Sequence, residues 1–210
     1  MNLSELQRDA LGEMANIGAS RAAKQLSLLL DDHIDINVPR VELITLPELG
    51  RRLAEQGVNS IACVYQDLEG ALNGQVFLVF HDQDSRSLVH ALIGDAEVSS
   101  QILLREYEHE AITEVGNIII STFAAMMADL LVTDLRLGLP HYSEGEADIL
   151  LAALPSDVHP ETTVVIVVQT VLTAANRNVS GALMVVLKVH SAEALLERLD
   201  AMIRNLQGNA

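Results

Sequence analysis

The sequence has a single cysteine, few basic residues and no long apolar run. Cys63 alone cannot form an internal disulfide, which fits a reducing compartment and predicts a cytoplasmic protein. Thirteen basic residues against 29 acidic ones give a formal net charge of −16. Nucleic acid and anionic lipid would both be repelled, so neither is expected as a partner. The longest apolar run, residues 117–129, is too short and too mixed for membrane insertion, and the acidic N-terminus does not have the pattern of a signal peptide.

What the sequence does contain is an internal repeat. The stretch "DALGEMANIGAS" at residues 9–20 aligns with "EAITEVGNIIIS" at 110–121, at an offset of 101 residues. The identities at this offset are Ala10/Ala111, Glu13/Glu114, Asn16/Asn117, Ile17/Ile118, Ser20/Ser121, Ala23/Ala124 and Pro39/Pro140. So many matches in a short window indicate an internal duplication. Because half of the residues are apolar, the chain can bury a substantial core. We therefore expect one domain, residues 1–210, made of two repeats at about 1–98 and 102–210.

The periodicity of the sequence predicts similar elements in both repeats. In the first repeat we expect a long helix at 3–31, an extended segment through 36–44, a short helix at 46–56, strands at 60–67 and 73–81, and a helix at 84–93. In the second we expect a helix at 102–132, strands at 163–172 and 180–190, and a helix at 191–206. The segment 141–162 contains two prolines and is expected to be a loop without a counterpart of the short helix. The strands rich in valine and isoleucine are expected to be buried on both faces or close to it.

Both long predicted helices carry a polar stripe opposite an apolar face. Residues spaced four, three and four apart lie along one side of a helix, which aligns Asp9, Glu13, Asn16 and Ser20, and likewise Glu110, Glu114, Asn117 and Ser121. A solvated helix face would explain the glutamates. Asparagine is harder to explain, because it is a poor helix former in mid-helix. Its appearance twice, one turn after a glutamate, suggests a function, and the residues alone leave both interpretations open.

The chemistry of the pair suggests hydrolysis on a partner molecule. A carboxamide donates and accepts hydrogen bonds at once, so an asparagine can orient a water molecule. A carboxylate nearby can bind a lysine or arginine of the partner. The partner would then supply the electrophile and the metal ion. The seven histidines have no spacing typical of a metal site, so we expect no metal ion or other cofactor of this chain's own.

The spacing of these residues resembles that of the CheC/CheX/FliY phosphatases of bacterial chemotaxis. Their pattern is Asp or Ser, three residues, Glu, two residues, Asn, 22 residues and Pro. The first copy matches it completely, from Asp9 to Pro39, and the second departs from it only at Glu110. The segments "EMANIGAS" and "IDINVPRVELI" are also typical of the family, and two copies in one chain resemble its CheC-type members. The resemblance covers essentially the whole chain.

This resemblance implies both a fold and an activity. The fold would be α+β, an α/β sandwich with two pseudo-two-fold-related halves that share a largely antiparallel sheet, and both motif helices would be exposed on one face. The activity would be dephosphorylation of a phosphorylated CheY-like response regulator. Asn16 and Asn117 would orient water for in-line attack on the aspartyl phosphate, and Glu13 and Glu114 would bind the regulator's active-site lysine.

Further implications concern the supporting residues and the partners. Asp9, Glu110, Ser20 and Ser121 would support the site or contact the partner, and Mg²⁺ would belong to the regulator. Pro39 and Pro140 are expected to set where a strand begins after each helix and to take no part in the chemistry. The family also binds CheD, a receptor-modifying deamidase. A non-catalytic adaptor that binds CheD or a regulator is therefore the alternative to a phosphatase.

Overall fold

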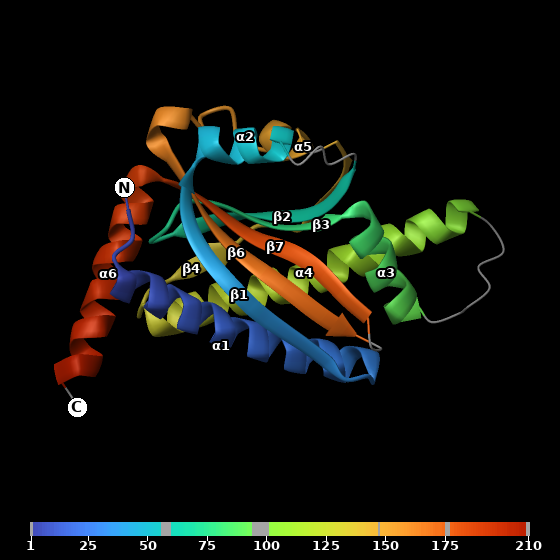
Figure 1. Ribbon diagram of the computed structural model, residues 1–210, viewed down its shortest axis with the longest axis horizontal. Helices are drawn as coiled ribbons and strands as arrows, with labels where there is room; N and C mark the ends of the chain where they lie inside the picture. The colour runs from blue at the N-terminus through green and yellow to red at the C-terminus, as the bar shows by residue number, and fades with distance from the viewer. Residues whose placement is uncertain (1, 56–59, 94–100, 147, 175–176, 209–210) are drawn as a thin grey trace.

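The protein is an α/β sandwich in which helices cover both faces of one antiparallel sheet (Figure 1). The computed structural model describes residues 2–55, 60–93, 101–146, 148–174 and 177–208. Its elements in chain order are α1 (Glu5–Leu30), β1 (Ile34–Thr45), α2 (Leu46–Glu55), β2 (Ile61–Gly70), β3 (Gly74–His81), α3 (Asp82–Ile93), α4 (Gln101–Leu130), β4 (Leu135–Leu137), β5 (His141–Gly145), α5 (Ile149–Ala152), a 3₁₀ turn (Pro160–Thr162), β6 (Thr163–Ala174), β7 (Arg177–Lys188) and α6 (Val189–Gly208).

The seven strands interleave the two halves of the chain. Their order is β1-β6-β7-β3-β2-β4, and β5 also pairs with β2. Strands β3 and β7 meet at the centre, where Phe77 pairs with Met184 and Leu78 with Leu183. Each half therefore contributes a central strand (β3 or β7), the strand beside it (β2 or β6) and one edge of the sheet. The edge strand β1 of the first half corresponds to β4 and β5 of the second. The shared antiparallel sheet and the pseudo-two-fold relation of the halves are confirmed.

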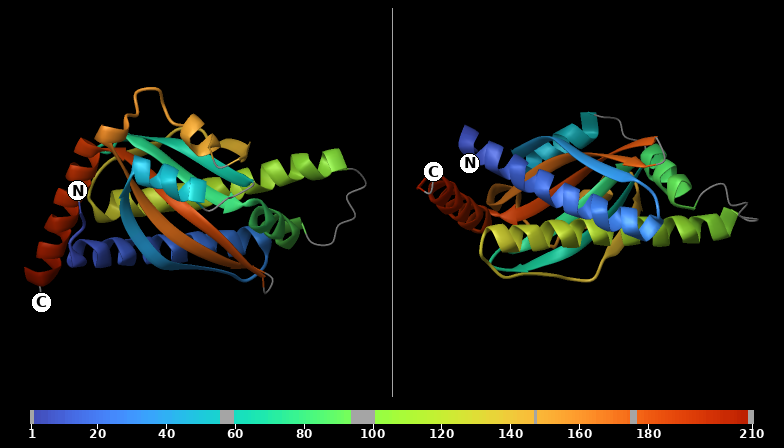
Figure 2. Two further views of the ribbon diagram at one scale, coloured as in Figure 1. Left: turned by 45° about the horizontal axis from the view of Figure 1, so that its top comes forward. Right: turned by 90° about the horizontal axis from the view of Figure 1, so that it is seen from below.

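Two hydrophobic cores lie on opposite faces of this sheet. The larger core packs α1, α3, α4 and α6 against one face, and the smaller packs α2 and α5 against the other. Figure 2, seen from below, shows α1 and α4 running side by side across the larger core. Strand β6 contributes to both cores because Val164, Ile166 and Val168 point to one face, and Val165 and Val167 to the other. Its burial on both faces confirms the expectation from its valine and isoleucine content.

The motif helices are positioned by local signals and by close packing. Helix α1 begins at a capping box, in which the Ser4 side chain accepts a hydrogen bond from the Gln7 backbone and the Gln7 side chain accepts one from the Ser4 backbone. Gly18 then allows α1 to approach α4, since a Cβ there would lie 3.1 Å from the Met126 Cε atom. Arg21 and Asp129 form an ion pair of 3.1 Å between the same two helices. These contacts hold both motif helices in one layer.

The apolar part of helix α4 is longer than the run at residues 117–129. Its segment Glu108–Leu130 is long and apolar enough to cross a membrane by length and composition, with a mean hydropathy of 1.5. In the fold it packs against the sheet, and 56 % of the apolar window is buried. An internal core helix satisfies the same length and composition test.

The structure confirms the predicted long helices and central strands. Two expectations are corrected, and the junction between the two repeats lies mostly outside the described residues. The segment 141–162 is not simply a loop. It contains β5, paired with β2, and α5, whose Leu150 is buried in the smaller core beside α2. Pro39 does not begin a strand either, because it lies inside β1, whereas Pro140 directly precedes β5, which begins at His141. The expected junction of the repeats, at residues 98–102, falls mostly within 94–100, which lie outside the described residues.

Candidate functional site

The first candidate site is an open groove between α1 and β1. Asp9, Glu13 and Asn16 are exposed along α1, and they line one wall of a groove of about 490 Å³. The opposite wall is the β1 segment from Val38 to Leu43, with Pro39 beside the motif helix. Ser20 is also exposed, one turn further along α1. The first motif therefore forms one side of an open groove, on the face of the sheet that α1 and α4 cover.

A bulge in β1 gives this groove its second wall. The pairing of β1 with β6 changes register between Asn37 and Arg40. Proline lacks a backbone N–H and fits an edge strand or a bulge, and Pro39 lies at this irregularity on the border of the sheet. Two cations line the groove, Arg8 from α1 and Arg40 from β1; Arg40 forms an ion pair of 2.9 Å with Glu42. Guanidinium groups stay charged at all physiological pH values.

The second candidate site is built on α4 and is more buried. Glu110 and Glu114 are exposed, whereas Asn117 and Ser121 are half-buried. The Asn117 Oδ1 atom accepts a hydrogen bond of 3.1 Å from the Nε2 atom of Gln66, a buried residue of β2. The Ser121 hydroxyl donates to the Ile118 carbonyl within the helix. The structure thus brings together Glu114 and Asn117, as predicted, and adds Gln66.

The basic side chains differ between the two sites. At the repeat offset of 101 residues, His109 takes the place of Arg8 and His141 that of Arg40. The His109 ring packs on Tyr142, with a centroid distance of 4.4 Å. The His141 ring stacks on Tyr65 at 5.2 Å. Burial, reinforced by the carboxylate of Glu144, raises the pKa of Tyr142, so its hydroxyl stays protonated at neutral pH.

The two sites lie apart because α1 and α4 run antiparallel. Arg21 pairs with Asp129, and the Thr122 hydroxyl donates to the Gln25 side chain. In this register Asn117 lies opposite the C-terminal end of α1, about 14 residues beyond Asn16. At a rise of 1.5 Å per residue the two asparagines are separated by roughly 20 Å along the helix axes. The structure therefore presents two separate sites, one from each repeat.

Sequence reasoning missed Gln66 and the basic side chains Arg8, Arg40 and His141. The basic side chains were within reach, because the repeat offset already aligns Arg8 with His109 and Arg40 with His141. Gln66 had no such signal. It lies 51 residues before Asn117 and meets it only through the packing of α4 on β2.

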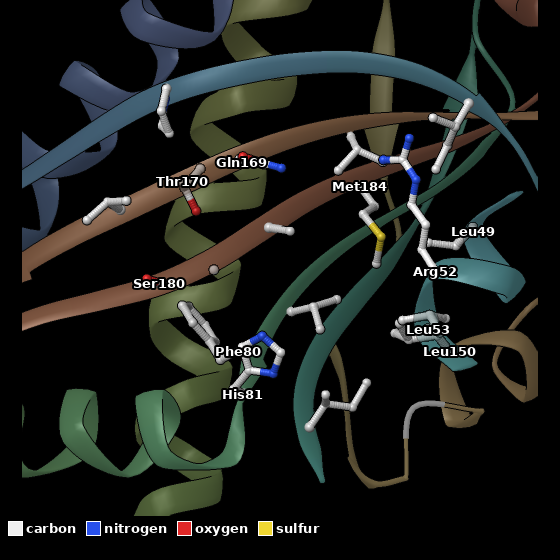
Figure 3. A pocket seen from close by; sticks show the side chains of 18 residues that line it. Leu49, Arg52, Leu53, Phe80, His81, Leu150, Gln169, Thr170, Ser180 and Met184 are labelled. Atoms are coloured by element: carbon white, nitrogen blue, oxygen red, sulfur yellow. The ribbon is translucent and has the colours of Figure 1, made fainter. Parts of the chain in front are cut away.

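A separate cavity lies on the other face of the sheet. It has a volume of about 300 Å³, and Figure 3 shows Leu49, Leu53 and Leu150 on one side of it and His81 and Met184 nearby. The motif glutamates and asparagines do not line it. Among the described residues, no group of three or more His, Cys, Asp or Glu side chains converges into a possible metal site. Cys63 is fully buried in β2, and this burial raises the pKa of its thiol to about 11.

Comparison with known proteins finds relatives in sequence and in fold. The model of the CheC-like family matches residues 6–43, which contain the complete first motif. The CheY-P phosphatase CheC of Bacillus subtilis is 29 % identical over 142 residues, covering 67 % of this chain and 68 % of that protein. The crystal structure of Thermotoga maritima FliY superposes with a TM-score of 0.73 at 22 % identity, over 96 % of this chain and all of that one. The chain is similar in sequence and in fold to members of the CheC/CheX/FliY family.

Two further proteins of the CheC/CheX/FliY family are similar to this chain. The flagellar motor switch phosphatase FliY of Bacillus subtilis is 29 % identical over 127 residues, 60 % of this chain, and the chain spans only 32 % of that protein's length. A CheX protein from Borrelia burgdorferi, solved in complex with CheY, BeF₃ and Mg²⁺, superposes with a TM-score of 0.53 at 13 % identity, over 84 % of this chain and 97 % of that one. The CheC/CheX/FliY fold thus extends over both repeats described here.

Proposed function

We propose that this protein stimulates dephosphorylation of a phosphorylated CheY-like response regulator. The observation that carries the proposal is the placement of two Glu–Asn pairs, each one helical turn apart, on the same layer of helices. Glu13, Asn16 and Glu114 are exposed, and Asn117 is half-buried. Two relatives are named CheY-P phosphatase and flagellar motor switch phosphatase. A CheX protein of the same fold forms a complex with CheY. These names and the two pairs support the same reaction class.

The reaction requires a positioned water more than a covalent catalyst. The water oxygen attacks phosphorus in line, the bond from phosphorus to the aspartyl oxygen breaks, and the products are the aspartate carboxylate and inorganic phosphate. In phosphoryl transfer most of the catalytic effect comes from positioning and charge stabilisation. Asn16 and Asn117 each offer an amide that can accept a hydrogen bond from the water and donate one to its oxygen or to the phosphoryl group. Mg²⁺ would be held by the regulator.

The glutamates would fix the regulator relative to the asparagines. Glu13 and Glu114 are exposed, so each can reach a cation on a docked surface. A carboxylate that binds the regulator's lysine forms a charge-assisted hydrogen bond, one turn away from the amide that holds the water. In the first groove Arg8 and Arg40 offset part of the negative charge of Asp9, Glu13 and Glu42, which reduces the repulsion between a phosphorylated surface and a chain of net charge −16.

The two asparagines provide the test of this function. We expect Asn16→Ala and Asn117→Ala to leave one active site each, and the double variant to reduce phosphate release to the regulator's own rate. Lys24→Ala, an exposed position on the α1 stripe, is the matched control and should retain wild-type activity. The assay follows phosphate release from a CheY-like regulator labelled with acetyl phosphate in the presence of Mg²⁺.

The same assay separates catalysis from an adaptor role. A wild-type protein that binds the regulator, or CheD, without accelerating phosphate release would be a non-catalytic adaptor. A double variant that accelerates release as well as the wild-type protein would refute the assignment of the asparagines. Binding is measured independently by titration calorimetry with the same regulator.

A further inference from the structure

Gln66 is a buried polar residue in an apolar environment. It lies in β2 on the face that packs against the motif helices, and only 1 % of its surface is exposed. Its neighbours on the same face of the strand, Val64 and Leu68, are 0 % and 2 % exposed. An apolar side chain would suit this position better, because burying an amide costs free energy unless its hydrogen bonds are satisfied. The amide of Gln66 donates to Asn117 Oδ1 at 3.1 Å.

The packing of α4 makes this contact possible. Gly116 directly precedes Asn117, and a Cβ at Gly116 would lie 2.5 Å from the Val64 Cβ atom. The absence of a side chain therefore lets α4 approach β2 at the level of Val64 and Gln66. The same approach leaves Asn117 half-buried, with its amide between the strand and the solvent.

The first site is built differently at the equivalent position. Arg40 pairs with Gln169, and His141 pairs with Tyr65, so the pseudo-two-fold relation aligns Gln66 with Thr170. A threonine side chain is shorter than a glutamine side chain by two atoms. Within the described part of the chain no hydrogen bond to the Asn16 side chain is found, and Asn16 is exposed whereas Asn117 is half-buried.

We propose that Gln66 is a positioning residue that fixes the Asn117 amide for catalysis at the second site. This inference rests on the proposed phosphatase function. The Gln66 donor occupies one lone pair of Asn117 Oδ1, which leaves the other lone pair and the NH₂ group for water and phosphate. Asn117 is thereby ordered before the partner binds. Asn16 is ordered only when the regulator docks, so the two sites differ in preorganisation.

Four enzyme variants test this role through the turnover number. The Asn16→Ala background leaves only the second site active, and Asn117→Ala leaves only the first. Gln66→Met removes the amide while keeping the length of the side chain. In the Asn16→Ala background we expect it to lower kcat roughly two- to tenfold, the range that follows from freeing one side chain, with KM unchanged. In the Asn117→Ala background we expect no change.

The background comparison separates positioning from a general loss of structure. An equal loss in both backgrounds, or no loss in either, overturns the proposal. A measurement on the wild-type protein covers the case in which Gln66→Met does not fold: ¹⁵N relaxation of the side-chain amides should give a higher order parameter for Asn117 than for Asn16. Equal order parameters overturn the proposal as well. If the double asparagine variant keeps full activity while Asn117 is the more ordered, the proposed function fails but the hydrogen bond stands.

Discussion

Replacing Gly116 by alanine should destabilise the packing of α4 on β2. The added Cβ would lie 2.5 Å from Val64 Cβ and 2.7 and 2.8 Å from its two methyl carbons. Carbon atoms in good contact are about 3.5–4.0 Å apart, so the helix has to move away by roughly 1 Å. Val64 is fully buried. Overpacking of this kind costs about 1–3 kcal/mol.

A second glycine provides the matched control for this prediction. A Cβ at Gly12, inside α1, would meet no atom within 4 Å. Both substitutions gain about 1 kcal/mol because alanine is a better helix former than glycine. The difference between the variants therefore isolates the steric term. At about 2–4 °C per kcal/mol for a chain of this size, we expect Gly116→Ala to melt roughly 2–12 °C below Gly12→Ala.

Thermal and urea unfolding of the two variants measure this difference. A double-mutant cycle with Val64→Ala adds a direct check, because it removes the two methyl carbons at 2.7 and 2.8 Å and leaves the Cβ atom at 2.5 Å. The cost of Gly116→Ala should then fall in part in the Val64→Ala background. Equal melting temperatures for Gly116→Ala and Gly12→Ala would refute the close approach of α4 to β2.

Three further predictions concern α1, the thiol and α2. Ser4→Ala removes the side-chain acceptor at the start of α1 and should lower the free energy of unfolding by about 1 kcal/mol, as measured by urea denaturation. Because burial raises the pKa of Cys63 to about 11, its thiol stays protonated at pH 8, and it should react with a disulfide reagent only after unfolding. Arg51 and Arg52 lower the pKa of Glu48 to about 2. Since this pKa lies below its unfolded value of about 4.3, the stabilising contribution is present above pH 4 and is lost as the pH falls toward 2. Acid titration should therefore show a loss of stability between pH 4 and pH 2 that is larger for the wild-type protein than for Glu48→Gln.

Most of the fold was predictable because strong periodic signals coincided with the repeat. The long helices, the central strands and the order of elements follow from side-chain patterns that repeat every 3.6 residues in a helix and every 2.0 residues in a strand. Because of the duplication, each pattern occurs twice in the sequence. The prediction of a loop at 141–162 was wrong because the elements in this segment are short. Strand β5 is five residues long and α5 only four, and both exist because tertiary contacts with β2 and the smaller core stabilise them. Elements of this length carry little local information.

The candidate site was predictable where the residues share a helix. Fixed spacing placed Glu13 one turn before Asn16, and Glu114 one turn before Asn117, and the structure has both pairs on the helix surfaces as expected. The other walls of the sites depend on long-range pairing. The β1 bulge at Pro39 and the approach of Gln66 to Asn117 are set by strand register and by the packing at Gly116, which a linear pattern does not encode.

The two prolines have a consequence for the behaviour of the protein at high concentration. Strand β1 forms one border of the sheet, and the β4–β5 pair forms the other. An uninterrupted border strand offers a row of free donors and acceptors to which another molecule can add a strand. Here each border is interrupted by a residue that has no N–H to offer, Pro39 on one side and Pro140 on the other. The duplication has thus supplied each border with its own barrier to fibril-like growth, and Pro39 also lines the groove of the first site.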